Sequence, residues 1–126
     1  MKATLAGHVI VEDRAVIGGL SAVHQFVRIG QLALIGGCSK VVQDVPPFMI
    51  ADGHSAKVFG LNNVGLERAG FSETEKNILR KAFKIIFRSG STLKNAIDQL
   101  EKECLPSVSI ESLIDFLKKS ERGISR

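Results

Sequence analysis

A branched apolar residue recurs at every sixth position near the start of this chain. The series is Leu5, Val11, Ile17, Val23, Ile29, Ile35 and Val41. Two positions before each member stands a small or β-branched residue: Ala3, Val9, Ala15, Ser21, Val27, Ala33 and Ser39. A helix would repeat about every 3.6 residues and an exposed strand every two, so neither explains the series. An internal repeat fixes the architecture before any other signal.

The six-residue period predicts one short strand and one turn per repeat. Three repeats close a coil of 18 residues, with branched side chains inward and coils stacked about 4.8 Å apart. This is a parallel β-helix. The coil predicts two inner columns: Leu5, Val23 and Val41 in one, Ile17 and Ile35 in the other. It also predicts outer neighbours: Gly7 under Gln25, Gly19 under Gly37, and His8 near His24.

The repeat is expected to end at Pro46 and Pro47, because proline cannot donate to a strand ladder. We therefore expect a β-helix over residues 1–47, an ordered, irregular connector over 48–71 and a domain of three helices over 72–126. Solenoids need caps at their ends. Since the repeat begins in mid-phase, we interpret the chain as the C-terminal piece of a longer β-helix, with a naturally short protein as the alternative.

The last part of the chain changes to helical periodicity. Ser72 and Glu75 fit a capping box ahead of an apolar helix face. Gly90 is expected to end that helix. Ser91 should cap a second helix and Ser109 should begin a third. The polar tail, SERGISR, is expected to fray.

Composition excludes several classes of protein. The 126 residues are 44% hydrophobic, which suffices for a packed core. No apolar run approaches the roughly 18 residues of a membrane span, so we expect no membrane insertion. Cys38 and Cys104 lie in different segments without metal-ligand spacing. We therefore expect reduced thiols, no metal, and a cytoplasmic protein.

The basic excess of this chain is local. Five basic residues and no acidic one occur between positions 76 and 88: Lys76, Arg80, Lys81, Lys84 and Arg88. At helical spacing they form a basic stripe, which is either a solvated face or a dock for an acidic partner or a phosphate. No nucleic-acid-reading motif accompanies the stripe, so nucleic acid is not an expected partner.

Several strings occur in a fixed order along the chain: LAGH, AVHQF, GGCS, QDVPPF and FGLNNVGLERAGF. With the repeat and the helical tail, residues 3–126 resemble the C-terminal half of the UDP-N-acetylglucosamine acyltransferase family. The resemblance implies a left-handed parallel β-helix followed by a small C-terminal helical domain, assembled as a homotrimer. It implies transfer of a 3-hydroxyacyl chain from acyl carrier protein to the 3-hydroxyl of UDP-N-acetylglucosamine, the first step of lipid A biosynthesis. No separate cofactor is implied, because the acyl group arrives on the phosphopantetheine of the carrier protein.

The resemblance also assigns catalytic and sugar-binding positions. Gly7 matches the backbone that donates to the developing oxyanion, and His8 matches the active-site histidine beside it. His24 and Gln25 match the pair that contacts the sugar and the nucleotide. The family's general base lies on the coil before Ala3. Neither histidine is therefore assigned as the base, and we expect negligible turnover by these 126 residues alone.

Further positions concern the nucleotide and the acyl chain. Asn62 and Arg68 match nucleotide- and phosphate-contacting residues, and an arginine fork suits a diphosphate. Gly37 matches the position that limits acyl length, where a glycine leaves space for a longer chain. Three residues depart from the family pattern at positions expected to affect nucleotide contact: Ser55, Val64 and Ala69.

Two other interpretations remain open. A different hexapeptide transferase, using acetyl-CoA, would explain the repeat but not FGLNNVGLERAGF or the helices. A non-catalytic module would serve trimerisation or carrier-protein docking, and the basic stripe suits an acidic carrier protein. A short β-helix also leaves apolar flanks for self-association, and we expect Leu20, Phe26 and Leu32 at contacts between subunits.

Overall fold

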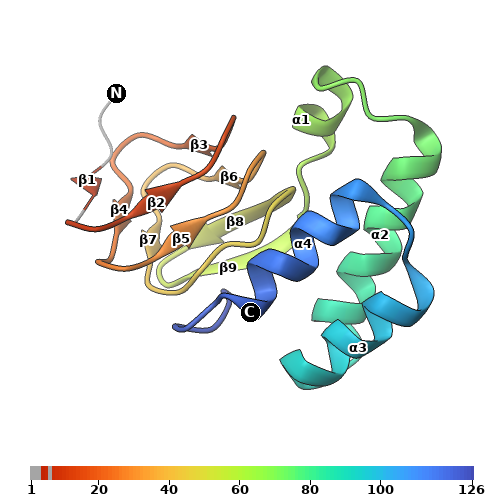
Figure 1. The fold of residues 1–126 in the computed structure, drawn as a ribbon. Coiled ribbons are helices and arrows are strands. Elements are labelled where there is room, and N and C mark those ends of the chain that lie inside the picture. Colours follow the sequence, from red (N-terminus) through yellow and green to blue (C-terminus); the bar gives the residue numbers. More distant parts are fainter. Residues whose placement is uncertain (1–3, 6) are drawn as a thin grey trace. The chain divides into compact units, whose positions relative to one another are not determined.

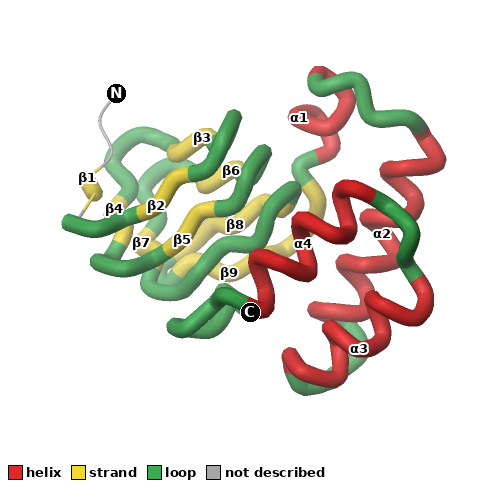
Figure 2. Tube along the Cα trace, viewed as in Figure 1, coloured by secondary structure: helices red, strands yellow, loops and turns green. Residues whose placement is uncertain are grey.

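The computed structural model describes residues 4–5 and 7–126. The first part of the chain winds through short strands joined by tight turns (Figures 1 and 2). These are β1 (Thr4–Leu5), β2 (Ile10–Val11), β3 (Val16–Ile17), β4 (Ala22–Val23), β5 (Arg28–Ile29), β6 (Leu34–Ile35) and β7 (Lys40–Val41). They pair in parallel, and their order is β1-β4-β7 in one sheet, β2-β5 in a second and β3-β6 in a third. The sequence repeat therefore folds as stacked parallel coils.

The observed register confirms the predicted inner columns. Leu5 pairs with Val23 and Val23 with Val41, while Ile17 pairs with Ile35. Val23, Ile35 and Val41 are at most 2% exposed. Leu5 keeps 46% of its surface exposed, because among the described residues only the following coil covers it.

Each coil turns its corners through a left-handed backbone conformation. Non-glycine residues with φ between 56° and 68° recur at every sixth position: His8, Arg14, Leu20, Phe26, Leu32 and Cys38. Side chains other than glycine enter this region at a cost of about 1 kcal/mol or more. The inward apolar columns and the ladder between coils hold these residues there.

The coils continue past the two prolines, contrary to the sequence prediction. β8 (Met49–Gly53) pairs in parallel with β6, and β9 (Ala56–Leu61) then pairs antiparallel with β8. The prolines precede β8 and donate to no ladder themselves. A Cβ added at Gly30 would lie 2.3 Å from the Pro47 nitrogen, so glycine is what lets the proline pack closely. The expected irregular connector is thus largely a β-hairpin.

The chain divides into two compact units. The β unit contains the residues up to Asn62 and Ser120–Arg126, and the helical unit contains Asn63–Lys119. The helical unit is therefore an insertion whose two ends both continue into the β unit. These boundaries differ from those expected from the sequence, because the last seven residues return to the coils.

The helical unit contains α1 (Asn63–Arg68), α2 (Glu73–Phe87), α3 (Leu93–Glu103) and α4 (Val108–Lys118). The capping box of Ser72 with Glu75 is confirmed. The other two caps lie near, but not at, the predicted residues: Thr92 caps α3 and Ser107 caps α4. α2 ends at Phe87, before Gly90. No helix among the described residues is long and apolar enough to cross a bilayer.

The polar tail does not fray. Ile124 bridges Asp44 in parallel, and Ile124 and Ser125 are at most 5% exposed. A polar tail frays when its backbone N–H and C=O groups have no hydrogen-bonding partner in the protein. Here the backbone of the β unit supplies such partners, so the tail stays in place.

Candidate functional site

The predicted active-site histidine stands at a rigid corner of the β unit. His8 has a φ of 56° and an exposed side chain. Its ring stacks on that of Phe26, with centroids 5.7 Å apart and planes inclined by 12°. The Phe26 N–H also donates to the His8 carbonyl at 2.9 Å. The imidazole therefore lies nearly parallel to an aromatic ring of the following coil, and the His8 side chain remains exposed.

His24 and Gln25 lie on the next coil, immediately before Phe26, and both side chains are exposed. The His24 N–H donates to the Val41 carbonyl at 2.9 Å, which fixes its backbone in the ladder. His8 thus stacks on Phe26 from the preceding coil, and His24 stands two positions before Phe26 in the sequence. The ring neighbour of His8 is Phe26, whereas the sequence predicts that His24 lies near it. The 18-residue coil carries this signal, since positions 8 and 26 are one coil apart.

The two glycines assigned to the site are not required by local packing. A Cβ added at Gly7 would meet no described atom within 4 Å, and one at Gly37 would make an ordinary contact of 3.4 Å with the Gly19 carbonyl. Gly18 differs, because its Cβ would lie 2.5 Å from the Gly37 nitrogen. Gly37 therefore leaves open surface beside the coil, whereas Gly18 allows two coils to approach closely.

Asn62 is buried rather than displayed. It is 6% exposed, and its side-chain Nδ2 donates to the Leu32 carbonyl at 2.8 Å. Its backbone N–H donates to the Phe48 carbonyl at 2.8 Å. The side chain thus ties the residue after β9 to the corner at Leu32, and its backbone N–H ties it to the corner at Phe48. Asn62 holds the backbone that follows β9 and does not present its amide nitrogen to solvent.

Arg68 ends α1 in the helical unit, and its side chain is exposed. The three departures from the family pattern also lie at or near the surface: Ser55 and Val64 are exposed and Ala69 is half-buried. The neighbour of Arg68, Glu67, is engaged by Lys76 of α2 at 2.6 Å. A cation at the C-terminus of a helix also complements the helix dipole.

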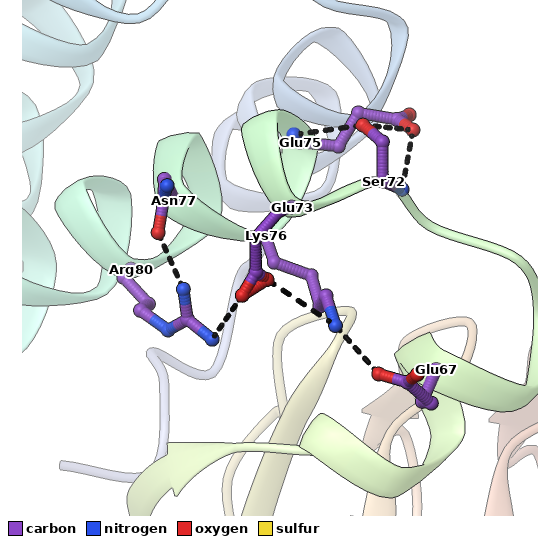
Figure 3. A network of polar contacts seen from close by, with 7 residues as sticks. All are labelled: Glu67, Ser72, Glu73, Glu75, Lys76, Asn77 and Arg80. Atoms are coloured by element: carbon purple, nitrogen blue, oxygen red, sulfur yellow. Dashed lines mark hydrogen bonds and ion pairs between the residues drawn. The ribbon is translucent and has the colours of Figure 1, made fainter.

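Three cations of the basic stripe are paired with carboxylates. Lys76 contacts Glu67 and, at 3.5 Å, Glu73. Arg80 reaches the same Glu73 at 3.8 Å (Figure 3). Lys81 pairs with Glu103 of α3 at 3.3 Å. The net positive charge displayed by the stripe is therefore smaller than its five basic residues suggest.

These pairs shift the acid–base equilibria of the groups involved. The hydrogen bond from Lys76 lowers the pKa of the Glu67 carboxyl, and the same bond raises the pKa of the Lys76 ammonium. Hydrogen bonds from Gln99 and then Lys81 lower the pKa of Glu103. Burial raises the pKa of the Cys104 thiol.

The other two cations of the stripe lie at a hollow in the helical unit. It is lined by Phe83, Lys84, Arg88 and Ser89. The Arg88 guanidinium lies over the Phe83 ring, 5.5 Å from its centroid, and no carboxylate contact accompanies Lys84 or Arg88 in the described part of the chain. An apolar floor with cations at its rim suits an acidic partner that also carries apolar surface.

The described residues hold no cluster of three or more His, Cys, Asp or Glu side chains that could bind a metal ion.

Comparison with known proteins identifies relatives of this chain. Residues 44–125 match the family described as UDP-N-acetylglucosamine O-acyltransferase, domain 2. The acyl-[acyl-carrier-protein]–UDP-N-acetylglucosamine O-acyltransferase of Aliivibrio fischeri is 48% identical over 124 residues, which are 98% of this chain and 47% of that protein. The same enzyme of Thiobacillus denitrificans is 44% identical over 98% of this chain and 48% of its own length.

Solved structures give the same result. LpxA from Acinetobacter baumannii superposes with a TM-score of 0.95 at 46% identity, covering 98% of this chain and 48% of that one. LpxA of Bacteroides fragilis, a UDP-N-acetylglucosamine acyltransferase, has a TM-score of 0.95 at 36% identity, covering 98% and 49%. The chain spans about half the length of the relatives that it matches.

Proposed function

Because this chain belongs to the UDP-N-acetylglucosamine O-acyltransferase family, we propose that it forms the C-terminal half of an acyl-transfer site. The reaction moves a 3-hydroxyacyl chain from acyl carrier protein to the 3-hydroxyl of UDP-N-acetylglucosamine, in lipid A biosynthesis. The carrier protein's phosphopantetheine delivers the acyl group, so the transfer needs no further cofactor. The observation that carries the proposal is the corner at which His8 stacks on Phe26 beside His24 and Gln25.

Each exposed residue of this corner has a chemical role in the proposal. The backbone at Gly7 donates to the oxyanion that develops on the thioester carbonyl, and the open space beside it admits the acyl group. His8, held against Phe26, orients the reacting group. His24 and Gln25 bind the sugar and the nucleotide. Fixed donors help because they need no reorganisation during the reaction.

Arg68 and Asn62 differ in how they serve the nucleotide. The exposed Arg68 guanidinium contacts the diphosphate, whose charge it matches bidentately. Asn62 is a positioning residue that holds the backbone after β9, because its buried amide nitrogen donates to the Leu32 carbonyl. Gly37 leaves space for the acyl chain along the coil surface.

We further infer a left-handed β-helix and a homotrimer. The superposition on solved relatives supports the winding. Two exposed apolar side chains support the subunit contact, since Leu20 is 78% and Phe26 is 59% exposed. Leu32 is withdrawn from that contact, because it is only 7% exposed and packs inside the β unit. Cys38 and Cys104 are both free thiols, which supports a cytoplasmic location.

Docking of acyl carrier protein is assigned to the hollow beside Lys84 and Arg88. These cations lie at an apolar surface without a carboxylate contact among the described side chains, while Lys76, Arg80 and Lys81 are already paired. A module that docks carrier protein without catalysis would use the same hollow and is the second candidate function.

Titration of the chain with UDP-N-acetylglucosamine, followed by backbone amide NMR, tests the proposal. The amides of His8, His24 and Gln25 should shift in a saturable manner, and Arg68→Ala should weaken binding about tenfold, the effect of losing one charged hydrogen bond. Arg14→Asn is the matched control, because Arg14 is an exposed corner residue in another column. Saturable shifts with coenzyme A, and none with the UDP-sugar, would favour an acetyl-CoA-dependent transferase instead.

A further inference from the structure

The last seven residues of the chain occupy a slot with hydrogen-bonding partners on both sides. On one side the Asp44 N–H donates to the Gly123 carbonyl at 3.0 Å, and the Ser125 N–H donates to the Asp44 carbonyl at 2.9 Å. On the other side the Val58 N–H of β9 donates to the Ser125 carbonyl at 2.8 Å. We call residues 120–126 the strap. Its backbone is paired as a strand would be in a sheet.

The slot is an extension of the β2-β5 sheet. Ile29 bridges Val45 in parallel, and Asp44 bridges Ile124 in parallel. The strap therefore continues the row of β2, β5 and residues 44–45, at the position where a further coil would stack. An uncovered edge of this kind presents unpaired N–H and C=O groups to any other strand.

Hydrogen bonds that involve side chains also join the strap to the rest of the β unit, in addition to the backbone pairing. The buried Asp44 carboxylate accepts from the Arg28 N–H at 2.8 Å and from the Ser120 hydroxyl at 2.6 Å. The Ser125 hydroxyl donates to the Gln43 carbonyl at 3.0 Å. These contacts select a hydroxyl at each end of the strap.

The middle of the strap is selected by shape. Gly123 has a φ of 81°, and a Cβ there would come within 3.0 Å of the Gln43 amide nitrogen. Gln43 Nε2 itself donates to the Arg122 carbonyl at 3.1 Å. Ile124 follows with 5% exposure. The slot thus recognises a glycine followed by a branched apolar residue and a serine.

We propose that this slot is a peptide-binding site of the β-augmentation type, which the chain fills with its own strap and which can accept the strap of a second copy. Strand addition at a sheet edge draws affinity from backbone hydrogen bonds and specificity from side-chain pockets, and both are present here. Peripheral segments open locally at a lower free energy than the core, so the strap can leave while the coils remain folded. The proposal is independent of the acyl-transfer site.

The test releases the strap in the full chain without changing the slot. Ile124→Asp with Ser125→Pro places a charge in the apolar position and removes the N–H that donates to Asp44. Glu121→Ala, an exposed strap residue, is the matched control. The amides of Asp44 and Val58 should exchange with solvent about tenfold faster or more in the released variant, and at the original rate in the control.

The probe is a synthetic seven-residue peptide with the strap sequence. Added to the released variant, it should bind saturably and restore protection at the Asp44 and Val58 amides. The same peptide with aspartate in place of isoleucine should do neither. Unchanged protection in the released variant, or no binding of the strap peptide at millimolar concentration, would overturn the proposal.

A measurement on the unaltered chain covers the case in which the released variant does not fold. The Asp44, Val58 and Ser125 amides should exchange together, and faster than the His24 amide, which bonds to Val41 within the coils. Exchange of all four at one common rate would mean that the strap opens only when the β unit unfolds, and it would contradict the proposal.

Discussion

The corners of the coils depend on single residues in unusual backbone conformations. Every sixth residue from His8 to Cys38 adopts a positive φ, and none of the six is a glycine. At His8 the conformation serves the proposed site, because it turns the imidazole onto Phe26. At exposed corners such as Arg14 the same conformation has no comparable ring contact, so its energetic cost can be measured there.

Arg14 allows that cost to be tested. Asparagine tolerates a positive φ, whereas the branched Cβ of valine clashes with the backbone in this region. We expect Arg14→Val to be about 1 kcal/mol less stable than Arg14→Asn by urea unfolding. Equal stability of the two variants would mean that the corner relaxes to another conformation.

Gly18 and Gly37 are two glycines on adjacent coils whose surroundings differ. Alanine at Gly18 would force its Cβ to 2.5 Å from backbone on the next coil, while alanine at Gly37 would make an ordinary contact at 3.4 Å. Gly18→Ala should cost about 2 kcal/mol, as overpacking typically does. Gly37→Ala should change the free energy of unfolding by less than about 0.5 kcal/mol. Similar losses in both variants would contradict the close packing at Gly18.

The two cysteines should differ in reactivity. Cys38 is exposed, whereas Cys104 is buried and its thiol pKa is raised. Since the thiolate is the reactive form, a disulfide reagent at neutral pH should modify Cys38 rapidly and Cys104 only on unfolding. Cys38→Ser should abolish the fast phase and Cys104→Ser should leave it intact. A fast phase that survives in Cys38→Ser would show that Cys104 is accessible.

Among the secondary-structure elements, α1 and α2 of the helical unit are connected by an ion pair. Lys76 contacts both Glu67 of α1 and Glu73 of α2, and Ser72 begins α2 with its capping box (Figure 3). The residues are exposed or half-buried, so their joint effect on stability is small and depends on salt and pH.

The pH dependence of the Glu67–Lys76 pair has a definite sign. The lowered pKa of Glu67 means that its contribution is present above the ordinary value near 4.5 and is lost as pH falls through the lowered value. The raised pKa of Lys76 preserves the pair until pH rises through that value.

Glu67→Gln should therefore lower the melting temperature near pH 7 but not near pH 2. Asp98→Asn, at an exposed position of α3, should show no such contrast. A melting-temperature difference of the same size at both pH values would contradict the assignment.

For the whole molecule, the expected assembly is a homotrimer. If the homotrimer forms, analytical ultracentrifugation should give about three times the 13.6 kDa of the chain. Leu20→Asp places a charge on an exposed apolar corner and should shift the mass toward one chain, whereas Arg14→Asn should not. A mass of one chain at micromolar concentration for the unaltered protein would count against the trimer.

Local sequence patterns are enough to predict the coils, their register and the family. The six-residue period follows from an inward column that repeats locally, and the strings around His8 and His24 lie within single repeats. The capping box at Ser72 is local as well. The caps of α3 and α4 were misplaced by one or two residues, because Ser91 and Thr92, or Ser107 and Ser109, are chemically equivalent candidates.

Folding of the whole chain brings together residues that no local pattern relates. It buried Asn62 against Leu32, neutralised three cations of the basic stripe, and turned the polar tail into a paired strand on Asp44. The contacts of Asn62 with Leu32, of Lys81 with Glu103 and of Ile124 with Asp44 leave no periodic trace, since each joins residues far apart in the chain. The contacts of Glu73 with Lys76 and Arg80 lie within α2 and are local. Backbone pairing in particular is independent of side-chain polarity, which is why SERGISR was predicted to fray and instead closes a sheet edge.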